Sequence, residues 1–454
     1  MKVGSVILAA GMSKRMKSAK PKVIHTLLGK PMLFYSIQAA QSVCDITPVV
    51  VVGHAAEEVK KNTTQPVTFV LQNEQLGTAH AVLMAEESLK EKADLVVITS
   101  ADMPLVTDST LKMLKQLQMS NSGHLSLVSI KGDRSRGFGR IIRDETGKVL
   151  RIVEEKVATA EELLVNEYNA GIYCVASDWL WTALHRVQKS RVGEYYLTDL
   201  LELAVSEGEK VQVLTLDDPE EAIGVNNRIH FAEVEKIMRK RVNEELMLSG
   251  VTMIDPERIS IEPGIEIGQD TIIYPDTYIK GNTTIGKNCE IGPETIIQDS
   301  TIGDDCTILK SVLEGAVLED HVEMGPFCRL RKGAHLGSHV HMGNFGEVKQ
   351  SHLGDGTKMG HFSYIGDAEI GEDVNIGAGT ITCNYDGERK NKTVIGAGTF
   401  IGSDTMLVAP LTIGKNAVTG AGAVVTKNVN DGEKVVGVPA HVIHPENNEV
   451  KKDE

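Results

Sequence analysis

The stretch Ile365-Gly366-Asp367-Ala368-Glu369-Ile370-Gly371-Glu372-Asp373-Val374-Asn375-Ile376-Gly377 sets an aliphatic residue before a glycine three times, at intervals close to six residues. The same pair recurs from about residue 265 to residue 425, for example at Ile285-Gly286 and Ile413-Gly414. Hexapeptide arrays of this kind build parallel β-helices, because stacked coils bury an aliphatic column that no single repeat can bury alone. The second half of the chain is therefore predicted to be a β-helix.

Length and composition limit the possible classes of protein. At 454 residues the chain exceeds one ordinary core, so we expect two domains. A net charge of -15 argues against a nucleic-acid or membrane-surface partner, although local basic clusters can still bind small polyanions. The six cysteines form no Cys-x-x-Cys pair, and Cys289 and Cys306 fall at turn positions of the repeat, which indicates packing by reduced thiols. With no signal peptide and no membrane-spanning run in the sequence, we expect a cytoplasmic protein.

Three segments are expected along the chain. Residues 1–227 alternate β-branched runs with helical patterns, which predicts a Rossmann-like α/β domain with a mostly parallel sheet. Residues 228–250 carry apolar residues at three- and four-residue steps among many charges, which predicts an amphipathic linker helix. Residues 251–454 are assigned to the β-helix domain, with a charged tail over 446–454 that is expected to be disordered. The clearest expected strands are 3–10, 47–52 and 95–99, and the clearest expected helices are 32–43 and 78–89.

A glycine-containing loop follows the first expected strand. Its sequence is Leu8-Ala9-Ala10-Gly11-Met12-Ser13-Lys14-Arg15-Met16, in which small residues would let backbone N–H groups approach phosphates. Arg15 and, further on, Lys22 would neutralise phosphate charge. Ligands of open α/β sheets bind at the carboxyl ends of the strands, where this loop lies. The pattern favours a nucleotide site, although an ordinary strand-to-helix turn can look the same.

Two further segments strengthen the nucleotide hypothesis. Asp102 follows the strand expected at 95–99, so its carboxylate would lie at the same sheet edge, where a phosphate-bound Mg²⁺ needs oxygen ligands. The segment Gln72–Ala79 is a polar loop that opens a helix.

These segments resemble the sugar-phosphate nucleotidyltransferase family, and with the hexapeptide tail nearly the whole chain resembles the bifunctional uridylyltransferase/acetyltransferase family. The resemblance implies that UTP is a substrate, that Gln72, Gly77 and Thr78 contact the uracil, and that Asp102 and Asn227 ligate Mg²⁺. The full set that it assigns to UTP and the UDP-sugar is Leu8, Ala9, Ala10, Gly11, Arg15, Lys22, Gln72, Gly77, Thr78, Asp102, Gly139, Glu154, Asn169 and Asn227, with Gly139, Glu154 and Asn169 on the sugar phosphate.

Two positions depart from the family pattern. The family loop usually reads Gly-x-Gly-Thr-Arg, whereas Ser13 and Lys14 replace the second glycine and the threonine here. The family more often has a glycine before the aspartate, whereas this chain has Ser100-Ala101. Both departures concern rate and nucleotide choice more than the type of reaction.

The hexapeptide pattern is interrupted by residues that suit catalysis. Asn384–Lys392 is a polar, basic loop of the kind that carries a site on a rigid scaffold. Arg329–Lys332 places three cations within four residues, suitable for the phosphate of a sugar or of coenzyme A. His361 could deprotonate an amine that attacks a thioester, although most of the 14 histidines must be structural or solvated. A purely structural β-helix is the alternative.

In the bifunctional family, the segment Gly360–Tyr364 resembles the motif of the general base, which implies that His361 is catalytic and that the β-helix is left-handed. The family often has an arginine near the end of the β-helix, whereas this chain has Val436–Ala440, so another cation such as Lys427 would replace it. The resemblance assigns glucosamine phosphate to Arg331, Lys349, Tyr364 and Asn375, and acetyl-CoA to Ala378, Asn384, Tyr385, Ser403 and Ala421.

The favoured hypothesis is a bifunctional enzyme with two consecutive reactions. Its tail acetylates glucosamine 1-phosphate with acetyl-CoA, and its head transfers UMP from UTP to N-acetylglucosamine 1-phosphate, releasing pyrophosphate and the UDP-sugar that cell-wall synthesis uses. The resemblance and an exposed aliphatic wall also imply a homotrimer with acetyl-transfer sites between subunits. Two alternatives remain open at this point: a single-activity sugar nucleotidyltransferase with a structural tail, and a non-catalytic assembly subunit of the same layout.

Overall fold

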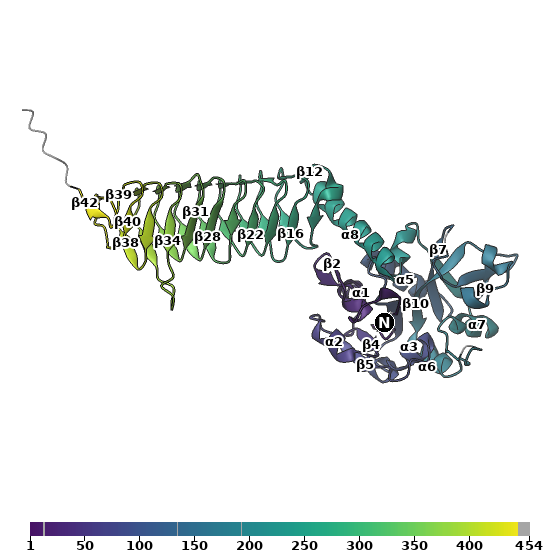
Figure 1. Ribbon diagram of the computed structural model, residues 1–454. Coiled ribbons are helices and arrows are strands. Elements are labelled where there is room, and N and C mark those ends of the chain that lie inside the picture. Colours follow the sequence, from purple (N-terminus) through teal and green to yellow (C-terminus); the bar gives the residue numbers. More distant parts are fainter. Residues whose placement is uncertain (12–13, 134, 192, 444–454) are drawn as a thin grey trace, which may run out of the picture. The chain divides into compact units, whose positions relative to one another are not determined.

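The computed structural model describes residues 1–11, 14–133, 135–191 and 193–443 and separates into two compact units, Met1–Met238 and Arg239–Glu454 (Figure 1). Helix α8 (Arg228–Leu248) contains the boundary between them, where the linker helix is expected. Ser13 and the tail 446–454 lie outside the described residues. Among the helices that are described, none is both long and apolar enough to cross a membrane.

The first unit is built on a sheet whose strands run in the order β11-β7-β10-β6-β1-β4-β5. All its neighbouring strands pair in parallel except β10, which is antiparallel to both β6 and β7, so the predicted mostly parallel sheet is confirmed. The bounds are β1 (Val3–Leu8), β4 (Val49–Val52), β5 (Thr68–Leu71), β6 (Leu95–Ser100), β7 (Leu125–Lys131), β10 (Glu167–Ala176) and β11 (Val211–Thr215), with a hairpin of β8 (Arg140–Arg143) and β9 (Val149–Val153) attached to β10.

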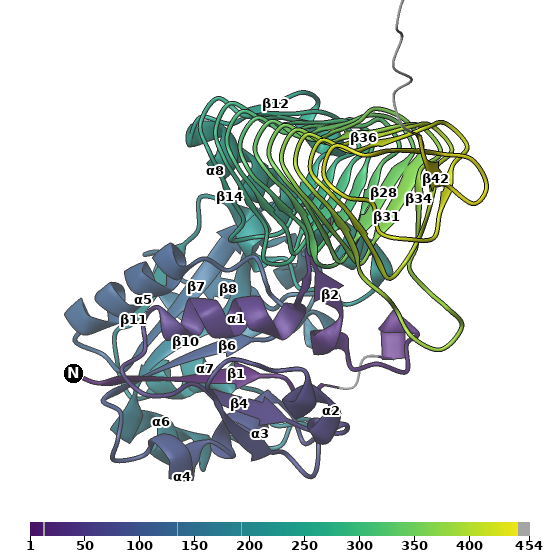
Figure 2. The same ribbon diagram turned by 90° about the vertical axis from the view of Figure 1, so that its left-hand side faces the viewer.

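Alternating side chains of the strands fill two cores, one on each face of this sheet. Val6 and Ile98 pack with α3, α6 and α7 on one face, whereas Ile7 and Val97 point to the other face, which α1 and α5 cover (Figure 2). These helices are α1 (Met32–Gln41), α3 (Thr78–Leu83), α5 (Asp108–Ser120), α6 (Ser177–Leu184) and α7 (Asp199–Ser206).

The helix expected over 78–89 is interrupted. It is observed as α3 (Thr78–Leu83) and α4 (Glu86–Leu89), because the Ala85 N–H donates to the Val82 carbonyl at 2.9 Å, three residues back. Such bonds tighten a last turn, and here they end the α-helical ladder.

The second unit is the predicted left-handed parallel β-helix, built of very short strands. Each strand pairs in parallel with the third strand along the chain, except at the C-terminal end, where β39 pairs with β41 and β41 pairs antiparallel with β42. It has three faces: a 12-strand face from β12 (Thr252–Met253) to β42 (His441–Val442), a 10-strand face from β13 (Ser260–Ile261) to β40 (Val424–Val425), and a 9-strand face from β14 (Glu266–Ile267) to β38 (Leu411–Ile413).

In-register isoleucines explain why the repeat folds in this way. On the 12-strand face, Ile273 of β15 (Ile272–Ile273), Ile291 of β18 (Glu290–Ile291) and Ile308 of β21 (Thr307–Ile308) are directly paired, and all three are fully buried. Their strand neighbours alternate outward, so each coil adds one rung to a continuous apolar column.

One segment leaves the coils. The chain between β34 (Ile381–Cys383) and β35 (Thr393–Ile395) forms the predicted loop, which projects from the stack near β34 in Figure 1. Its only described ladder pairing is between Tyr385 and Lys390.

Candidate active sites

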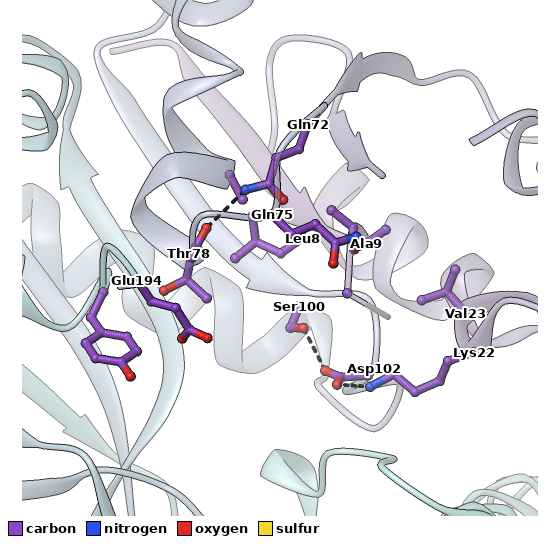
Figure 3. Close-up of a pocket in the computed structure, with 15 residues that line it drawn as sticks. Leu8, Ala9, Lys22, Val23, Gln72, Gln75, Thr78, Ser100, Asp102 and Glu194 are labelled. Atoms are coloured by element: carbon purple, nitrogen blue, oxygen red, sulfur yellow. Dashed lines mark hydrogen bonds and ion pairs between the residues drawn. The ribbon is translucent and has the colours of Figure 1, made fainter. Parts of the chain in front are cut away.

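A cavity of about 320 Å³ lies at the carboxyl ends of β1, β5 and β6 (Figure 3). These strands belong to the parallel part of the sheet, so their carboxyl ends meet at one edge, as a ligand site of this fold requires. The predicted residues that line the cavity are Leu8, Ala9, Ala10, Gly11, Lys22, Gln72, Gly77, Thr78 and Asp102.

Asp102 is held by two donors. The Lys22 ammonium nitrogen is 2.5 Å from one carboxylate oxygen, and the Ser100 hydroxyl donates to the other at 2.6 Å. Both charged side chains are mostly buried, with 12% of Lys22 and 22% of Asp102 exposed. Ser100, at one of the positions that depart from the family pattern, thus orients the carboxylate.

The oxygens of Asp102 and Asn227 are donors of the type that Mg²⁺ prefers, and Mg²⁺ commonly takes only one or two protein carboxylates beside substrate phosphates. The backbone N–H of Val225 donates to the Asp102 carbonyl at 2.8 Å, which keeps the segment with Asn227 next to Asp102. However, the Asn227 side-chain oxygen accepts the N–H groups of Ile229 and His230, both at 2.9 Å, and so caps α8. Asp102 therefore fits a metal better than Asn227 does.

Arg15 does not line the cavity. Its guanidinium donates to the Asn226 side-chain oxygen at 2.9 Å, next to the predicted ligand Asn227. Ser13, the loop residue that replaces the second glycine of the family pattern, lies outside the described residues.

The structure adds cavity residues that sequence reasoning did not assign to the site. Glu194 and Tyr196 come from the segment between α6 and α7, which docks on the loop at Gly77. A side chain at Gly77 would meet the Tyr195 carbonyl oxygen at 2.4 Å, and its φ of +114° favours glycine. The Thr78 hydroxyl accepts the N–H of Leu197 at 2.9 Å, so Thr78 also positions this segment. The remaining unassigned lining residues are Val23, Gln75, Ala81 and Ser100.

No signal in the sequence links the segment with Glu194 and Tyr196 to the loop at Gly77, about 120 residues earlier. The one exception is the glycine itself, because any side chain at Gly77 would prevent the contact between loop and segment. The link is a backbone pairing: the N–H of Tyr195 donates to the Leu76 carbonyl at 2.7 Å, and the N–H of Ala79 donates to the Tyr195 carbonyl at 3.0 Å.

The three residues assigned to the sugar phosphate lie together. The Asn169 N–H donates to the Gly139 carbonyl at 2.8 Å, and a Cβ at Gly139 would lie 3.7 Å from the Glu154 carboxyl carbon. Burial raises the pKa of Glu154, while a hydrogen bond from the Thr198 hydroxyl, at 3.1 Å, opposes the shift. Thr198 follows Tyr196, so the same docked segment links this cluster to the nucleotide cavity.

In the β-helix, His361 and three residues assigned to acetyl-CoA stack at the corner between the 12-strand and 10-strand faces. The backbone bonds that stack them are Gly379 N–H to Phe362 carbonyl at 2.7 Å, Asp404 N–H to Ala378 carbonyl at 2.6 Å, and Gly422 N–H to Ser403 carbonyl at 2.8 Å. The side chains at this corner after His361 are small, at Ala378, Ser403 and Ala421. A long, narrow ligand could therefore lie along it.

The cations assigned to the sugar phosphate, Arg331 and Lys349, lie at the opposite edge of the 10-strand face, where its strands end. Arg331 follows β25 (Arg329–Leu330), and Lys349 ends β28 (Gly346–Lys349). The Arg331 guanidinium donates to Glu347 at 3.0 Å. Lys390 of the projecting loop lowers the pKa of Lys349 by contact and by charge repulsion, whereas the charge of Asp367 opposes the shift. An anionic ligand would relieve this repulsion.

Tyr364 and Asn384 lie near the same cations. The Tyr364 hydroxyl and the Asn384 amide nitrogen both lie within 3 Å of where a side chain at Gly366 would be, and Asn384 donates to Asp367 at 2.5 Å. Between His361 and these groups runs β31 (Ser363–Gly366), about 10 Å of extended chain.

Two assigned residues stand apart from this group. Asn375, in β33 (Asn375–Ile376), lies on the 12-strand face between Lys358 and Phe400. Tyr385 is 62% exposed and belongs to the projecting loop. His361 is also exposed, and no described residue forms a hydrogen bond with its ring.

Comparisons with known proteins cover both units. Residues 5–198 match the MobA-like NTP transferase domain, and residues 264–299 and 392–427 match the bacterial transferase hexapeptide repeats. A protein of Thermosipho africanus is 46% identical over 440 residues, which are 97% of this chain and 95% of that protein. Relatives from Trichlorobacter lovleyi and Exiguobacterium sibiricum are 44% and 43% identical, over 94% of this chain and 93% and 95% of their own lengths. All three carry the name "Bifunctional protein GlmU".

Proposed function

This chain belongs to the family of bifunctional GlmU proteins, and from that premise we propose how its residues serve the two reactions of the family. The chain is a glucosamine-1-phosphate N-acetyltransferase and a UDP-N-acetylglucosamine diphosphorylase. Because its relatives match both units over nearly the whole length, the single-activity and non-catalytic alternatives are rejected.

In uridylyl transfer, the N-acetylglucosamine 1-phosphate oxygen attacks the α-phosphorus of UTP, and pyrophosphate leaves. No protein nucleophile is needed, since the reaction depends on positioning and on neutralising charge at the phosphates. We assign UTP to the cavity at β1, β5 and β6 and the sugar phosphate to Gly139, Glu154 and Asn169. Lys22 is the cation best placed for the phosphates, because its only described anionic partner is Asp102.

Mg²⁺, when bound, would neutralise charge on the triphosphate and on the leaving pyrophosphate. We propose Asp102 as its main protein ligand and Asn227 as the second. Lys22 and Ser100, which hold the Asp102 oxygens, are exchangeable donors, so either oxygen can be released toward a cation.

In acetyl transfer, the glucosamine amine attacks the thioester carbonyl of acetyl-CoA, the C–N bond forms, and coenzyme A leaves as its thiol. We propose that His361 accepts the amine proton through its unpaired ring nitrogen. Arg331 and Lys349 hold the phosphate, with Tyr364 and Asn375 also assigned to the sugar. Acetyl-CoA is assigned to the corner of Ala378, Ser403 and Ala421, whereas Asn384 and Tyr385, which are also assigned to it, follow β34 at the opposite edge of the 10-strand face.

The observation that carries this assignment is that His361 and Lys349 flank the same strand, β31: His361 precedes it, and Lys349 pairs with Gly366 at its other end. The test supplies glucosamine 1-phosphate, acetyl-CoA, UTP and Mg²⁺ together and follows free thiol and pyrophosphate separately. Thiol release must not require UTP, whereas pyrophosphate release must require acetyl-CoA. Pyrophosphate release from the amine without acetyl-CoA would contradict the proposed order.

A homotrimer is proposed from the outer surface of the 10-strand face. Tyr278 and Ile296 are paired on adjacent strands and are 44% and 37% exposed. The same outward column carries Arg329 and Glu347 further along, and apolar residues return at Ile381 and Met406, which are half-buried. Exposed apolar side chains on a sheet surface mark association surfaces. All six cysteines are free thiols, which supports a cytoplasmic location.

A further inference from the structure

The Gln72 side chain forms part of the cavity wall just after β5 and is only 4% exposed. Its amide nitrogen has two partners, the Gly77 carbonyl oxygen at 3.1 Å and the His80 ring nitrogen Nδ1 at 3.0 Å. Its amide oxygen has no hydrogen-bond partner in the part of the chain that the structure describes.

The two partners fix which way this amide faces. A carbonyl oxygen can only accept, so the NH₂ group must face Gly77. The second N–H then donates to His80 Nδ1, which can accept only in the neutral tautomer that carries its proton on Nε2. The amide oxygen is left on the cavity side, and Figure 3 shows the nitrogen in its dashed bond with the oxygen turned away from it.

An unpaired acceptor in a cavity wall selects a ligand that donates. Uracil carries an N–H at position 3, whereas cytosine, a base of the same size, carries a bare nitrogen there. A buried polar group that one ligand satisfies and another leaves unpaired discriminates strongly between them. We infer that His80 is a positioning residue that sets nucleobase choice, because it holds the Gln72 oxygen toward the cavity as the acceptor for uracil N3–H. This inference rests on the proposed placement of UTP in the cavity.

A structural role for His80 is the competing interpretation. His80 lies in the first turns of α3, next to the Gly77 loop that docks the segment with Glu194 and Tyr196. If His80 only supports that loop, its loss should impair UTP and CTP equally. If His80 orients the Gln72 amide, the loss of His80 should change the ratio of kcat/KM for UTP to kcat/KM for CTP.

The experiment measures kcat/KM for UTP and for CTP with N-acetylglucosamine 1-phosphate and Mg²⁺ in the full-length protein. In His80→Asn, the amide oxygen replaces Nδ1 as the acceptor, so the preference for UTP should be kept. In His80→Lys, an ammonium that only donates should draw the Gln72 oxygen and turn the NH₂ group to the cavity. The UTP-to-CTP ratio should then fall about tenfold or more.

Urea unfolding and circular dichroism of each variant report whether the head unit is folded, because acetyl transfer is assigned to the other unit. Should His80→Lys lose turnover with both nucleotides, calorimetric binding of UTP and CTP gives the same ratio without chemistry. Equal losses for the two nucleotides in His80→Lys, or loss of preference in His80→Asn, would overturn the inference. A wild-type protein that uses UTP and CTP equally would also overturn the inference about His80, but it would leave the proposed nucleotidyl transfer intact. A wild-type protein that releases no pyrophosphate with any nucleotide would instead refute the proposed function of the cavity.

Discussion

At the residue scale, the head unit places one aspartate where a nucleotidyltransferase needs a metal ligand. Both oxygens of Asp102 are engaged, by Lys22 and by Ser100, and Asn227 uses its oxygen to cap α8. Asp102 should therefore contribute more to Mg²⁺ binding than Asn227 does.

Asp102→Ala should lower uridylyl transfer by roughly a hundredfold or more, because it removes the main oxygen ligand and leaves Lys22 without its partner. Acetyl transfer should not change. Asp108→Ala is a matched control, since Asp108 forms an exposed ion pair with Lys112 and neither residue lines the cavity. Near-normal pyrophosphate release by Asp102→Ala at limiting Mg²⁺ would refute the assignment.

His361→Ala should reduce acetyl transfer by about 10² to 10⁴, because it removes the candidate base and leaves the buried column intact. Uridylyl transfer from N-acetylglucosamine 1-phosphate should persist. His341→Ala is the control, since His341 is an exposed histidine of the same β-helix that pairs with Glu323 at 3.1 Å. Unchanged thiol release by His361→Ala would eliminate it as the base.

Asp199 gives a prediction for stability against pH. Burial, with the charges of Glu202 and Glu154, raises its pKa from 3.8 to about 6. Between these values the folded state binds more protons than the unfolded state, so this group makes the free energy of unfolding fall as pH rises through the window. Because the side chain is only partly buried, the effect at pH 7 is about 1 kcal/mol after screening. Asp199→Asn should raise the melting temperature at pH 7.5 more than at pH 5, and an equal rise at both would contradict this account.

At the scale of elements, the docked segment with Glu194 and Tyr196 completes the nucleotide cavity. Its contact depends on Gly77, where a Cβ would overlap the Tyr195 backbone and where φ is +114°. Removal of this contact should therefore disturb the site without dismantling the sheet.

Gly77→Ala should lower uridylyl transfer strongly and destabilise the head unit by about 1 kcal/mol or more, because alanine is strained at positive φ and the segment must move. Gly132→Ala is the control, since its added Cβ would meet no atom within 4 Å. The measurement combines pyrophosphate release with urea unfolding. Full activity in Gly77→Ala would show that the segment does not form part of the site.

At the scale of the whole molecule, each unit has its own core and its own candidate site. The split falls inside α8, at Met238. A fragment of residues 1–238 should therefore make UDP-N-acetylglucosamine from the acetylated sugar phosphate but not from the amine. A fragment that has no uridylyl transfer although it is folded by circular dichroism would show that the units depend on each other.

The full-length protein should behave in light scattering as a particle of about three chains, because the exposed Tyr278 and Ile296 on the 10-strand face need a partner surface. Replacing the exposed Tyr278 and Ile296 with charged residues should weaken the trimer and acetyl transfer together, with uridylyl transfer kept. A monomer with full acetyl transfer would refute the trimeric site.

The sequence by itself determined the architecture, because the hexapeptide repeat of the second unit and the alternating strand and helix patterns of the first unit are both local. A hexapeptide repeat can bury its aliphatic residues only when coils stack. Alternating strands and helices can bury their apolar residues only when the helices cover the two faces of a parallel sheet. The same locality explains why the residues directly after β1 and β6 could be placed at one edge in advance, whereas the strand β5 before Gln72 was not predicted. It did not reveal that the helix over 78–89 breaks at Ala85.

Only the tertiary structure decided which groups meet. Glu194 and Tyr196 enter the cavity through a backbone pairing between residues about 120 positions apart, and Lys390 reaches Lys349 across an irregular loop. The orientation of the Gln72 amide depends on Gly77 and His80 together, and the oxygen of Asn227 is occupied by a helix cap. Such details arise from long-range contacts and from competition among hydrogen-bond partners, which no local pattern of residues encodes.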